Sequence, residues 1–195
     1  MDYLESIKNN TDIYFLEIGA FDGKSFDGLY RYTHNNNWTG LFVEPIKEYY
    51  DLLKLNFKNI EKKQFENSAI TEEDKPYEIK RLTGGQQENW KKGSSTLVEN
   101  GNSNKYEYET ETINGIRFNT LVEKYNIKKI DVLQIDTEGY DLKILEQIIP
   151  LFLPKYIKIE QRHLKSKDKT KMKKLLVSCG YDYKRVGLDY VCLLK

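Results

Sequence analysis

Short apolar runs alternate with amphipathic stretches along most of the chain. The runs that predict buried strands are residues 13–18 (IYFLEI), 40–44, 64–70, 130–135 and 156–160. The stretches with apolar residues at helical spacing are 24–34, 46–57, 117–125, 142–149 and 169–179. Continuous apolar strands separated by helices are typical of a parallel sheet that is covered on both faces. The pattern therefore predicts an α/β fold, a Rossmann-like sandwich.

Three further segments complete this pattern. Residues 181–195 predict an antiparallel hairpin with its turn near Gly187, which would add to the end of the sheet. Residues 106–113 are rich in Thr and Tyr and predict an exposed strand. Residues 83–104 are rich in Gly, Ser, Asn and Gln and predict a long surface loop, either a binding lid or a plain insertion.

Length and composition limit the classes of protein. The 195 residues fit a single domain, 1–195, and 31 basic against 30 acidic side chains argue against binding of nucleic acid or a membrane surface by bulk charge. The two cysteines, Cys179 and Cys192, show no CxxC spacing and indicate a reducing compartment. No apolar run approaches the ~18 residues of a membrane span, and the first ten residues do not resemble a signal peptide. We expect a cytoplasmic protein.

Acidic residues close the predicted strands. In an open parallel sheet the ligand lies beyond the carboxyl ends of the strands. Those ends carry Glu17, Glu44, Ser68, Asp136 and Glu160. The four carboxylates indicate a site for hydroxyl groups or a positively charged ligand, although any one of them could instead cap a helix.

The first strand is followed by a glycine-containing turn. Gly19 and Gly23 allow the backbone to turn sharply and approach a ligand, and the helix expected after Lys24 would favour an anionic group at its N-terminus. The spacing matches neither GxGxxG nor a P-loop, which argues against a nicotinamide enzyme and a P-loop NTPase. Glu44 stands where a Rossmann-like domain places the acid that binds ribose hydroxyls, although capping of the next helix is the alternative.

Three motifs together resemble a known family. They are the acid-x-Gly-x-x-x-Gly turn, the Glu44-Pro45 pair, and the segment 131–140 (DVLQIDTEGY), which is similar to D-x-L-K-I-D-x-E-G-x. Over residues 14–181 the chain resembles the FkbM-type S-adenosylmethionine-dependent methyltransferases. It departs from the usual pattern at Gln134, where lysine is common, at Asn119, where aspartate is common, and in its Phe21-Asp22 turn.

The resemblance implies a class I methyltransferase fold with S-adenosylmethionine as the cofactor. It implies that the first turn and Ser25 face the amino-acid end of the cofactor, that Glu44 beside Pro45 binds the ribose, and that Ser68 and Ala69 flank the adenine. The cofactor-binding residues are then expected to be Glu17, Gly19, Ala20, Phe21, Gly23, Ser25, Glu44, Pro45, Ser68, Ala69 and Asp136.

The resemblance further implies methyl transfer to a hydroxyl group of a sugar, glycan or small natural product. A hydroxyl acceptor needs a general base within hydrogen-bond reach. Asp136 is the first candidate, with Glu138 beside it, and His163 is the alternative. Some enzymes of this type use a divalent metal, and these residues with Glu160 could supply ligands, but their spacing is not diagnostic and we expect no metal.

Two other functions remain open from the sequence. A methyltransferase acting on RNA or protein could use Trp90 and the lysine-dense stretch 165–174, although only 5 of the 31 cations are arginine. A cofactor-binding module without turnover is the non-enzyme alternative. In the leading interpretation the partner is a small-molecule or glycan acceptor, and the loop 83–104 would influence which acceptor binds. The sequence does not indicate an oligomeric state.

Overall fold

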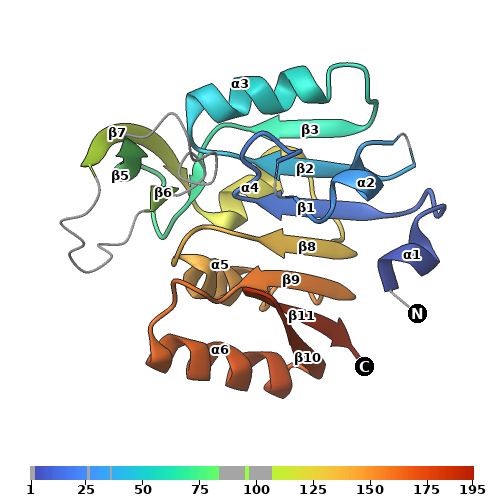
Figure 1. Ribbon diagram of the computed structural model, residues 1–195. Helices are drawn as coiled ribbons and strands as arrows, with labels where there is room; N and C mark the ends of the chain where they lie inside the picture. Colours follow the sequence, from blue (N-terminus) through green and yellow to red (C-terminus); the bar gives the residue numbers. More distant parts are fainter. Residues whose placement is uncertain (1–2, 26, 36, 84–94, 97–106) are drawn as a thin grey trace.

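A seven-stranded, mostly parallel sheet forms the centre of the protein (Figure 1). The computed structural model describes residues 3–25, 27–35, 37–83, 95–96 and 107–195. The strands lie in the order β10-β11-β9-β8-β1-β2-β3, and β11 runs antiparallel to both of its neighbours. Their bounds are β1 (Tyr14–Ile18), β2 (Thr39–Val43), β3 (Lys63–Glu66), β8 (Val132–Ile135), β9 (Tyr156–Glu160), β10 (Tyr181–Val186) and β11 (Asp189–Leu194). The predicted α/β fold with a C-terminal antiparallel hairpin is confirmed.

Helices cover both faces of this sheet. Side chains of α1 (Tyr3–Ile7), α2 (Tyr30–Thr33) and α3 (Lys47–Asn56) pack on Phe15, Phe42 and Val132. Side chains of α4 (Phe118–Tyr125), α5 (Asp141–Ile148) and α6 (Ser166–Ser178) pack on Leu16, Leu133 and Ile157 on the other face. Adjacent strand residues point to opposite faces, so the inner strands, which are apolar at most positions, are stabilised by two separate cores.

The predicted helix over residues 24–34 is wrong, because of the residues that the structure describes in this range only Tyr30–Thr33 is helical. The Asp22 carboxylate accepts hydrogen bonds from the backbone N–H groups of Lys24 and Ser25, and Asp27 accepts one from Leu29. Such local side-chain bonds hold the backbone in turns and compete with helix formation. The turn after β1 therefore presents no helix N-terminus to a ligand.

A second, smaller sheet interrupts the alternation after β3. The predicted strand 64–70 is divided, because β3 joins the central sheet whereas β4 (Ala69–Ile70) pairs with β7 (Glu107–Ile116). The prediction of a strand at 106–113 is confirmed by β7, which extends further. The order of the small sheet is β4-β7-β5-β6, with β5 (Pro76–Thr83) and β6 (Ser95–Thr96). Of the predicted loop 83–104, Thr83 and β6 are strand residues, and the other residues lie outside the described part of the chain.

The small sheet lies at the carboxyl ends of the central strands (Figure 1). Ile79 of β5 and Ile113 of β7 are buried against Ile46, Tyr49 and Ala69, so the small sheet is fixed to the start of α3 by an apolar cluster of its own. In the described ranges, no helix is long and apolar enough to cross a membrane.

Candidate active site

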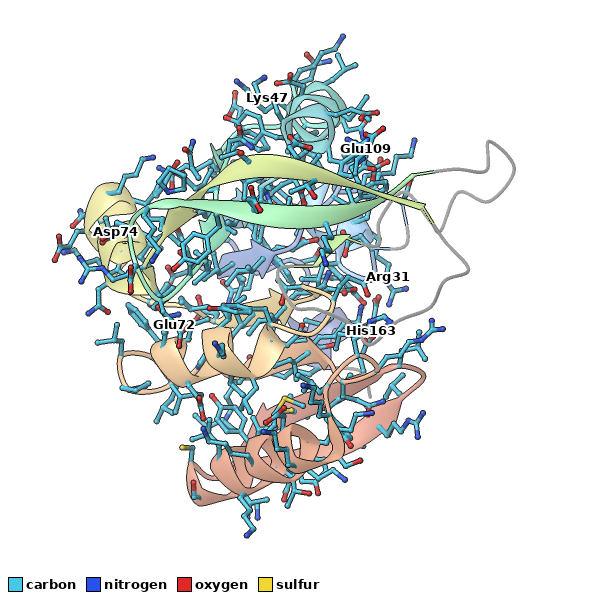
Figure 2. All side chains as sticks on the ribbon, turned by 90° about the vertical axis from the view of Figure 1, so that its left-hand side faces the viewer. Arg31, Lys47, Glu72, Asp74, Glu109 and His163 are labelled. Carbon is cyan, nitrogen blue, oxygen red and sulfur yellow. The ribbon has the colours of Figure 1, made fainter. Side chains whose placement is uncertain are left out.

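Two adjoining hollows open at the carboxyl ends of the central strands. The apolar hollow has about 590 Å³ of space between its walls and the polar hollow about 960 Å³. Gly19, Phe21, Asp136 and Glu138 line both, so the two hollows form one continuous crevice. Figure 2 views this end of the molecule, with the strands of the small sheet crossing in front between α3 and α5, and His163 below them.

Apolar side chains from three regions enclose the first hollow. Ile46 and Tyr49 come from the start of α3, Ile79 comes from the small sheet, and Ile70 and Tyr140 complete the wall. The polar groups that interrupt this surface include Glu44, Ser68 and Glu138. A mostly apolar cavity with a few placed polar groups suits a flat organic ligand that carries hydroxyls at one side.

Glu44 joins the two loops that frame the apolar hollow. Its carboxylate is 4% exposed and accepts hydrogen bonds from the backbone N–H groups of Phe21 and Ile46, each at 2.8 Å. The alternative, that Glu44 caps the next helix, is not what the structure shows, because the N-cap residue of α3 is Ile46 and no described side chain caps this helix. At this helix, Glu44 bonds only to the N–H of that N-cap residue. A carboxylate has about four lone-pair positions, so two of them remain to accept from ligand hydroxyls. Burial raises the pKa of Glu44 to about 8, although the two backbone bonds act to lower it.

The stability of the ligand-free protein should depend on pH through Glu44. Its folded-state pKa of about 8 lies above the ordinary glutamate pKa of 4.5, so the folded state binds more protons between these values and the free energy of unfolding falls as pH rises. Urea unfolding of wild type and Glu44→Gln between pH 5 and pH 8 tests this. In the variant, the free energy of unfolding should fall less steeply with pH, and the difference in slope can reach about 1.4 kcal/mol per pH unit for one group. Its absolute stability will also differ, since an amide cannot accept both backbone bonds, but equal slopes would contradict the prediction.

Buried polar side chains form the base of the polar hollow. Nε2 of Gln134 donates to Oε1 of Glu17 at 3.2 Å and to Oδ1 of Asp27 at 3.0 Å. Oε2 of Glu17, Oδ2 of Asp27 and Oε1 of Gln134 are buried and have no hydrogen-bond partner among the described residues. Burial, and then the charge of Asp27, raise the pKa of Glu17 well above its usual value, while Lys158 acts to lower it. The base of this hollow thus offers acceptors that need a donor or a cation.

Gly19 and Asp136 are in contact where the two hollows meet. Gly19 has φ +80°, and a Cβ atom there would lie 1.8 Å from the carbonyl oxygen of Asp136. The Asp136 carboxylate opens into the crevice, and within the described ranges no hydrogen bond or ion pair reaches it. Desolvation by the surrounding walls, and then the charges of Glu160, Asp141 and Glu138, raise the pKa of Asp136 well above its usual value.

His163 lies between two carboxylates at the rim of the polar hollow (Figure 2). Its Nδ1 atom is 2.5 Å from Oε2 of Glu138 and 3.2 Å from Oε1 of Glu160. Hydrogen bonds to Glu138 and then Glu160 raise the pKa of His163 to about 10. In this arrangement the imidazole is protonated at neutral pH, which does not suit the role of proton acceptor.

Most residues predicted for the site are brought together by the fold. The two hollows are lined by Glu17, Gly19, Ala20, Phe21, Ser25, Glu44, Pro45, Ser68, Ala69, Asp136, Glu138 and His163. Gly23 lines neither hollow, because its α-carbon faces Leu53 and Phe57 of the α3 region.

Sequence reasoning missed three residues that build the site. Asp27 and Gln134 form its base, and Asp141 is fully buried and accepts hydrogen bonds from the N–H groups of Thr137 and Gly139. No local turn signal marks Asp141, because its hydrogen bonds run back to residues two and four positions earlier, whereas an Asx turn bonds to the backbone two residues further on.

The arrangement of strands, turn and acidic residues agrees with a comparison of the sequence with protein families. The family described as "Methyltransferase FkbM domain" matches residues 17–183. The chain belongs to the FkbM methyltransferase domain family. Methyltransferases of this family use S-adenosylmethionine as the methyl donor. A search of curated proteins gave no match.

Solved structures resemble this FkbM domain in fold. A methyltransferase FkbM from Methylobacillus flagellatus KT has a TM-score of 0.58 at 12% identity over 94% of this chain and 44% of its own. An O-methyltransferase from Bacillus cereus in complex with SAH has a TM-score of 0.54 at 12% identity, over 98% of this chain and 77% of its own. A fibrillarin from Aeropyrum pernix with natively bound S-adenosyl-L-methionine has a TM-score of 0.52 at 12% identity, over 95% of this chain and 66% of its own. The FkbM domain thus spans less than half of the M. flagellatus protein.

The crevice of this FkbM domain fits the donor of its family. The apolar hollow offers a buried carboxylate for vicinal hydroxyls, and the polar hollow offers buried acceptor oxygens without donors, among them Oε2 of Glu17. A nucleoside joined to an amino acid carries matching groups, an apolar base, two hydroxyls and an ammonium.

Proposed function

We propose that this FkbM domain transfers a methyl group from S-adenosylmethionine to a hydroxyl group of a sugar, glycan or small natural product. The position of Asp136 carries the proposal. Its carboxylate lies at the wall shared by the two hollows, and none of the described residues hydrogen-bonds it. A carboxylate so placed is available to an acceptor hydroxyl that meets the methyl donor there.

The two hollows support one orientation of the cofactor. We place the adenine between Ser68, Ala69 and the apolar wall, and the ribose hydroxyls on Glu44. The amino-acid end then extends past Gly19 toward Ser25 and the acceptors at the base of the polar hollow. S-adenosylmethionine supplies an electrophilic methyl group on a positively charged sulfur, which would lie beside Asp136.

In this orientation the protein mainly positions two reactants. The acceptor hydroxyl would hydrogen-bond to Asp136, and the Asp136 carboxylate would take its proton as the oxygen receives the methyl group that the donor supplies, with the thioether as the leaving group. No covalent enzyme intermediate is needed, so alignment of the reacting atoms accounts for most of the rate.

The charge of the polar hollow supports a small acceptor over RNA. It is lined by two cationic or protonatable residues, Arg162 and His163, and by carboxylates, namely those of Glu17, Asp27, Asp136, Glu138 and Glu160. Such a lining repels the phosphates of a nucleic acid, whose binding depends on clustered Lys and Arg. If the affinity for the substrate changes only weakly with salt concentration, that result would agree with this interpretation.

We also propose that the domain acts in the cytoplasm. Cys179 and Cys192 are both free thiols, and Cys192 is buried. Free cysteines of this kind suit a reducing compartment.

Calorimetric titration of S-adenosylmethionine and S-adenosylhomocysteine tests the cofactor site. Wild type should bind both, and Glu44→Ala should weaken binding at least about tenfold, because two hydroxyls lose their hydrogen-bond acceptor. Asp131→Ala is the matched control, since Asp131 is a partly buried acid at the amino end of β8 that accepts the backbone N–H of Tyr14 and lines neither hollow.

Each outcome of this titration is informative. No binding by folded wild type would remove the methyltransferase proposal, and equal weakening in both variants would remove the role of Glu44. Once binding is established, a screen of hydroxyl-bearing acceptors separates an enzyme from a module that binds without turnover.

A further inference from the structure

We propose that Glu138, Glu160 and His163 bind a divalent first-row transition-metal cation such as Mn²⁺ at the rim of the polar hollow. The three residues are brought together by two neighbouring strands. Glu138 lies in the turn after β8, Glu160 ends β9, and His163 follows it. Each offers one ligand atom, and these atoms all lie within 4.8 Å of one another.

The three ligand atoms lie close enough for one ion to reach all of them after a local rearrangement. Atoms that are each about 2.1 Å from an ion lie about 3.0 Å apart in cis positions and at most about 4.2 Å apart. Nδ1 of His163 is 2.5 Å from Oε2 of Glu138, which is the distance of a direct hydrogen bond, and 3.2 Å and 3.3 Å from the two oxygens of Glu160. An ion would therefore displace the proton that His163 shares with the carboxylates, and small side-chain rotations that separate Glu138 from His163 would complete a coordination set of two carboxylates and one imidazole.

The backbone holds these side chains in place before any ion binds. Glu138 has φ +56°, a conformation that a glutamate rarely adopts, and Asp141 fixes its turn through hydrogen bonds from Thr137 and Gly139. The same turn packs on the backbone of His163, because a Cβ atom at Gly139 would lie 3.5 Å from the His163 carbonyl oxygen. The neighbouring loops are thus in contact, which keeps both ligands at the rim.

Buried acceptors in the same hollow also call for a cationic or hydrogen-donating ligand, a role that in the proposed orientation the ion would share with the amino-acid end of the cofactor. Glu17 is 1% exposed and Gln134 is 5% exposed, and each has an oxygen, Oε2 and Oε1 respectively, without a partner among the described residues. Both residues line the polar hollow with Glu138, Glu160 and His163. Buried carboxylates are costly unless they are paired or bound, and a divalent ion with its water molecules supplies both charge and donors.

The donor set selects the class of ion. An imidazole beside two carboxylates favours Mn²⁺, Fe²⁺, Co²⁺ or Zn²⁺ over Ca²⁺ and Mg²⁺, which prefer oxygen ligands throughout. If the proposed hydroxyl methylation holds, an ion here would bind the acceptor's oxygen and make its proton easier to remove. That role depends on the proposed function, whereas the binding of the ion does not.

Titration of Mn²⁺ into chelator-treated full-length protein, followed by electron paramagnetic resonance and calorimetry, tests the site. Wild type should bind one ion, and His163→Ala and Glu138→Gln should each weaken binding at least about tenfold. His34→Ala is the control for an adventitious imidazole, because the ring of His34 packs on Tyr30 and Phe57. It should bind Mn²⁺ as wild type does.

Two measurements keep the result interpretable. Thermal melting shows whether each variant is folded. Because His163→Ala and Glu138→Gln are both measured, the test remains if one of them does not fold. S-adenosylhomocysteine is titrated into the same samples, so that loss of the metal site and failure of the methyltransferase proposal give different results. Absence of Mn²⁺ binding by wild type, with Co²⁺ and Zn²⁺ also failing to bind, would overturn the site. So would unchanged binding in both variants, which would leave His163 as an ion-paired imidazolium only.

Discussion

Replacing Gly19 by alanine should abolish measurable binding of S-adenosylhomocysteine and lower the melting temperature. A Cβ atom at this position would lie 1.8 Å from the carbonyl oxygen of Asp136 and 2.8 Å from its carbonyl carbon. Both contacts are to backbone, so no side-chain rotation relieves them. Either the turn after β1 or the end of β8 must move, and both line the crevice. We expect at least a ~100-fold loss of affinity, about 2.7 kcal/mol, in calorimetry.

Gly187→Ala is the matched control for this prediction. Gly187 also has a positive φ, +62°, but no atom lies within 4 Å of a Cβ placed there. This substitution carries only the conformational cost of a left-handed alanine, about 1–2 kcal/mol. It should lower the melting temperature by several degrees and leave affinity unchanged. If Gly19→Ala bound the ligand as Gly187→Ala does, the close approach to Asp136 would have no importance for the site.

The inner strands of the central sheet could be predicted from the sequence because most of their residues are apolar and buried, with only a few polar residues near their carboxyl ends. Residues 130–135 contain β8 and residues 156–160 coincide with β9, since strands buried on both faces leave no ambiguity about which positions are apolar. The same reasoning placed Glu44 and Asp136 at one edge, because parallel strands present their carboxyl ends together.

The small sheet could not be predicted in the same way. β5 pairs with β7 from Pro76 opposite Asn114 to Thr83 opposite Glu107, so its partner lies far along the chain. Polar and apolar side chains alternate only weakly along β5, so this strand is recognisable only through its pairing with β7. The helix predicted over 24–34 failed for a local reason, because Asp22 and Asp27 bond to nearby backbone N–H groups.

The base of the polar hollow shows a third limit of sequence reasoning. Gln134 attracts attention in the sequence as a departure from a family motif, whereas in the fold it joins Glu17 to Asp27. Glu17 and Gln134 are register partners on adjacent strands, a relation that depends on the strand order. The same holds for Glu138 and Glu160, whose carboxylates meet at His163 although β8 and β9 are separated by α5 along the chain.

Replacing Asp136 by asparagine should abolish most methyl transfer while the cofactor stays bound. Asparagine has nearly the shape of aspartate but cannot take a proton from the acceptor hydroxyl, and loss of a general base costs about 10²–10⁴ in kcat. The S-adenosylhomocysteine affinity should change by no more than a few-fold, because the backbone of residue 136, which Gly19 contacts, is unaltered. Initial rates with saturating donor and acceptor, measured beside calorimetry, give both quantities.

Asp131→Asn is the matched control, at the opposite end of the same strand. Its carboxylate accepts the backbone N–H of Tyr14 at 2.8 Å, and an amide oxygen can accept the same bond. The rate of this variant should stay near that of wild type. A rate for Asp136→Asn equal to the control would assign the proton to another group and leave Asp136 as a residue that only shapes the crevice. If the variant lost both rate and cofactor affinity, Asp136 would instead be a cofactor-binding residue. A base that contacts only the acceptor should not change the affinity for S-adenosylhomocysteine.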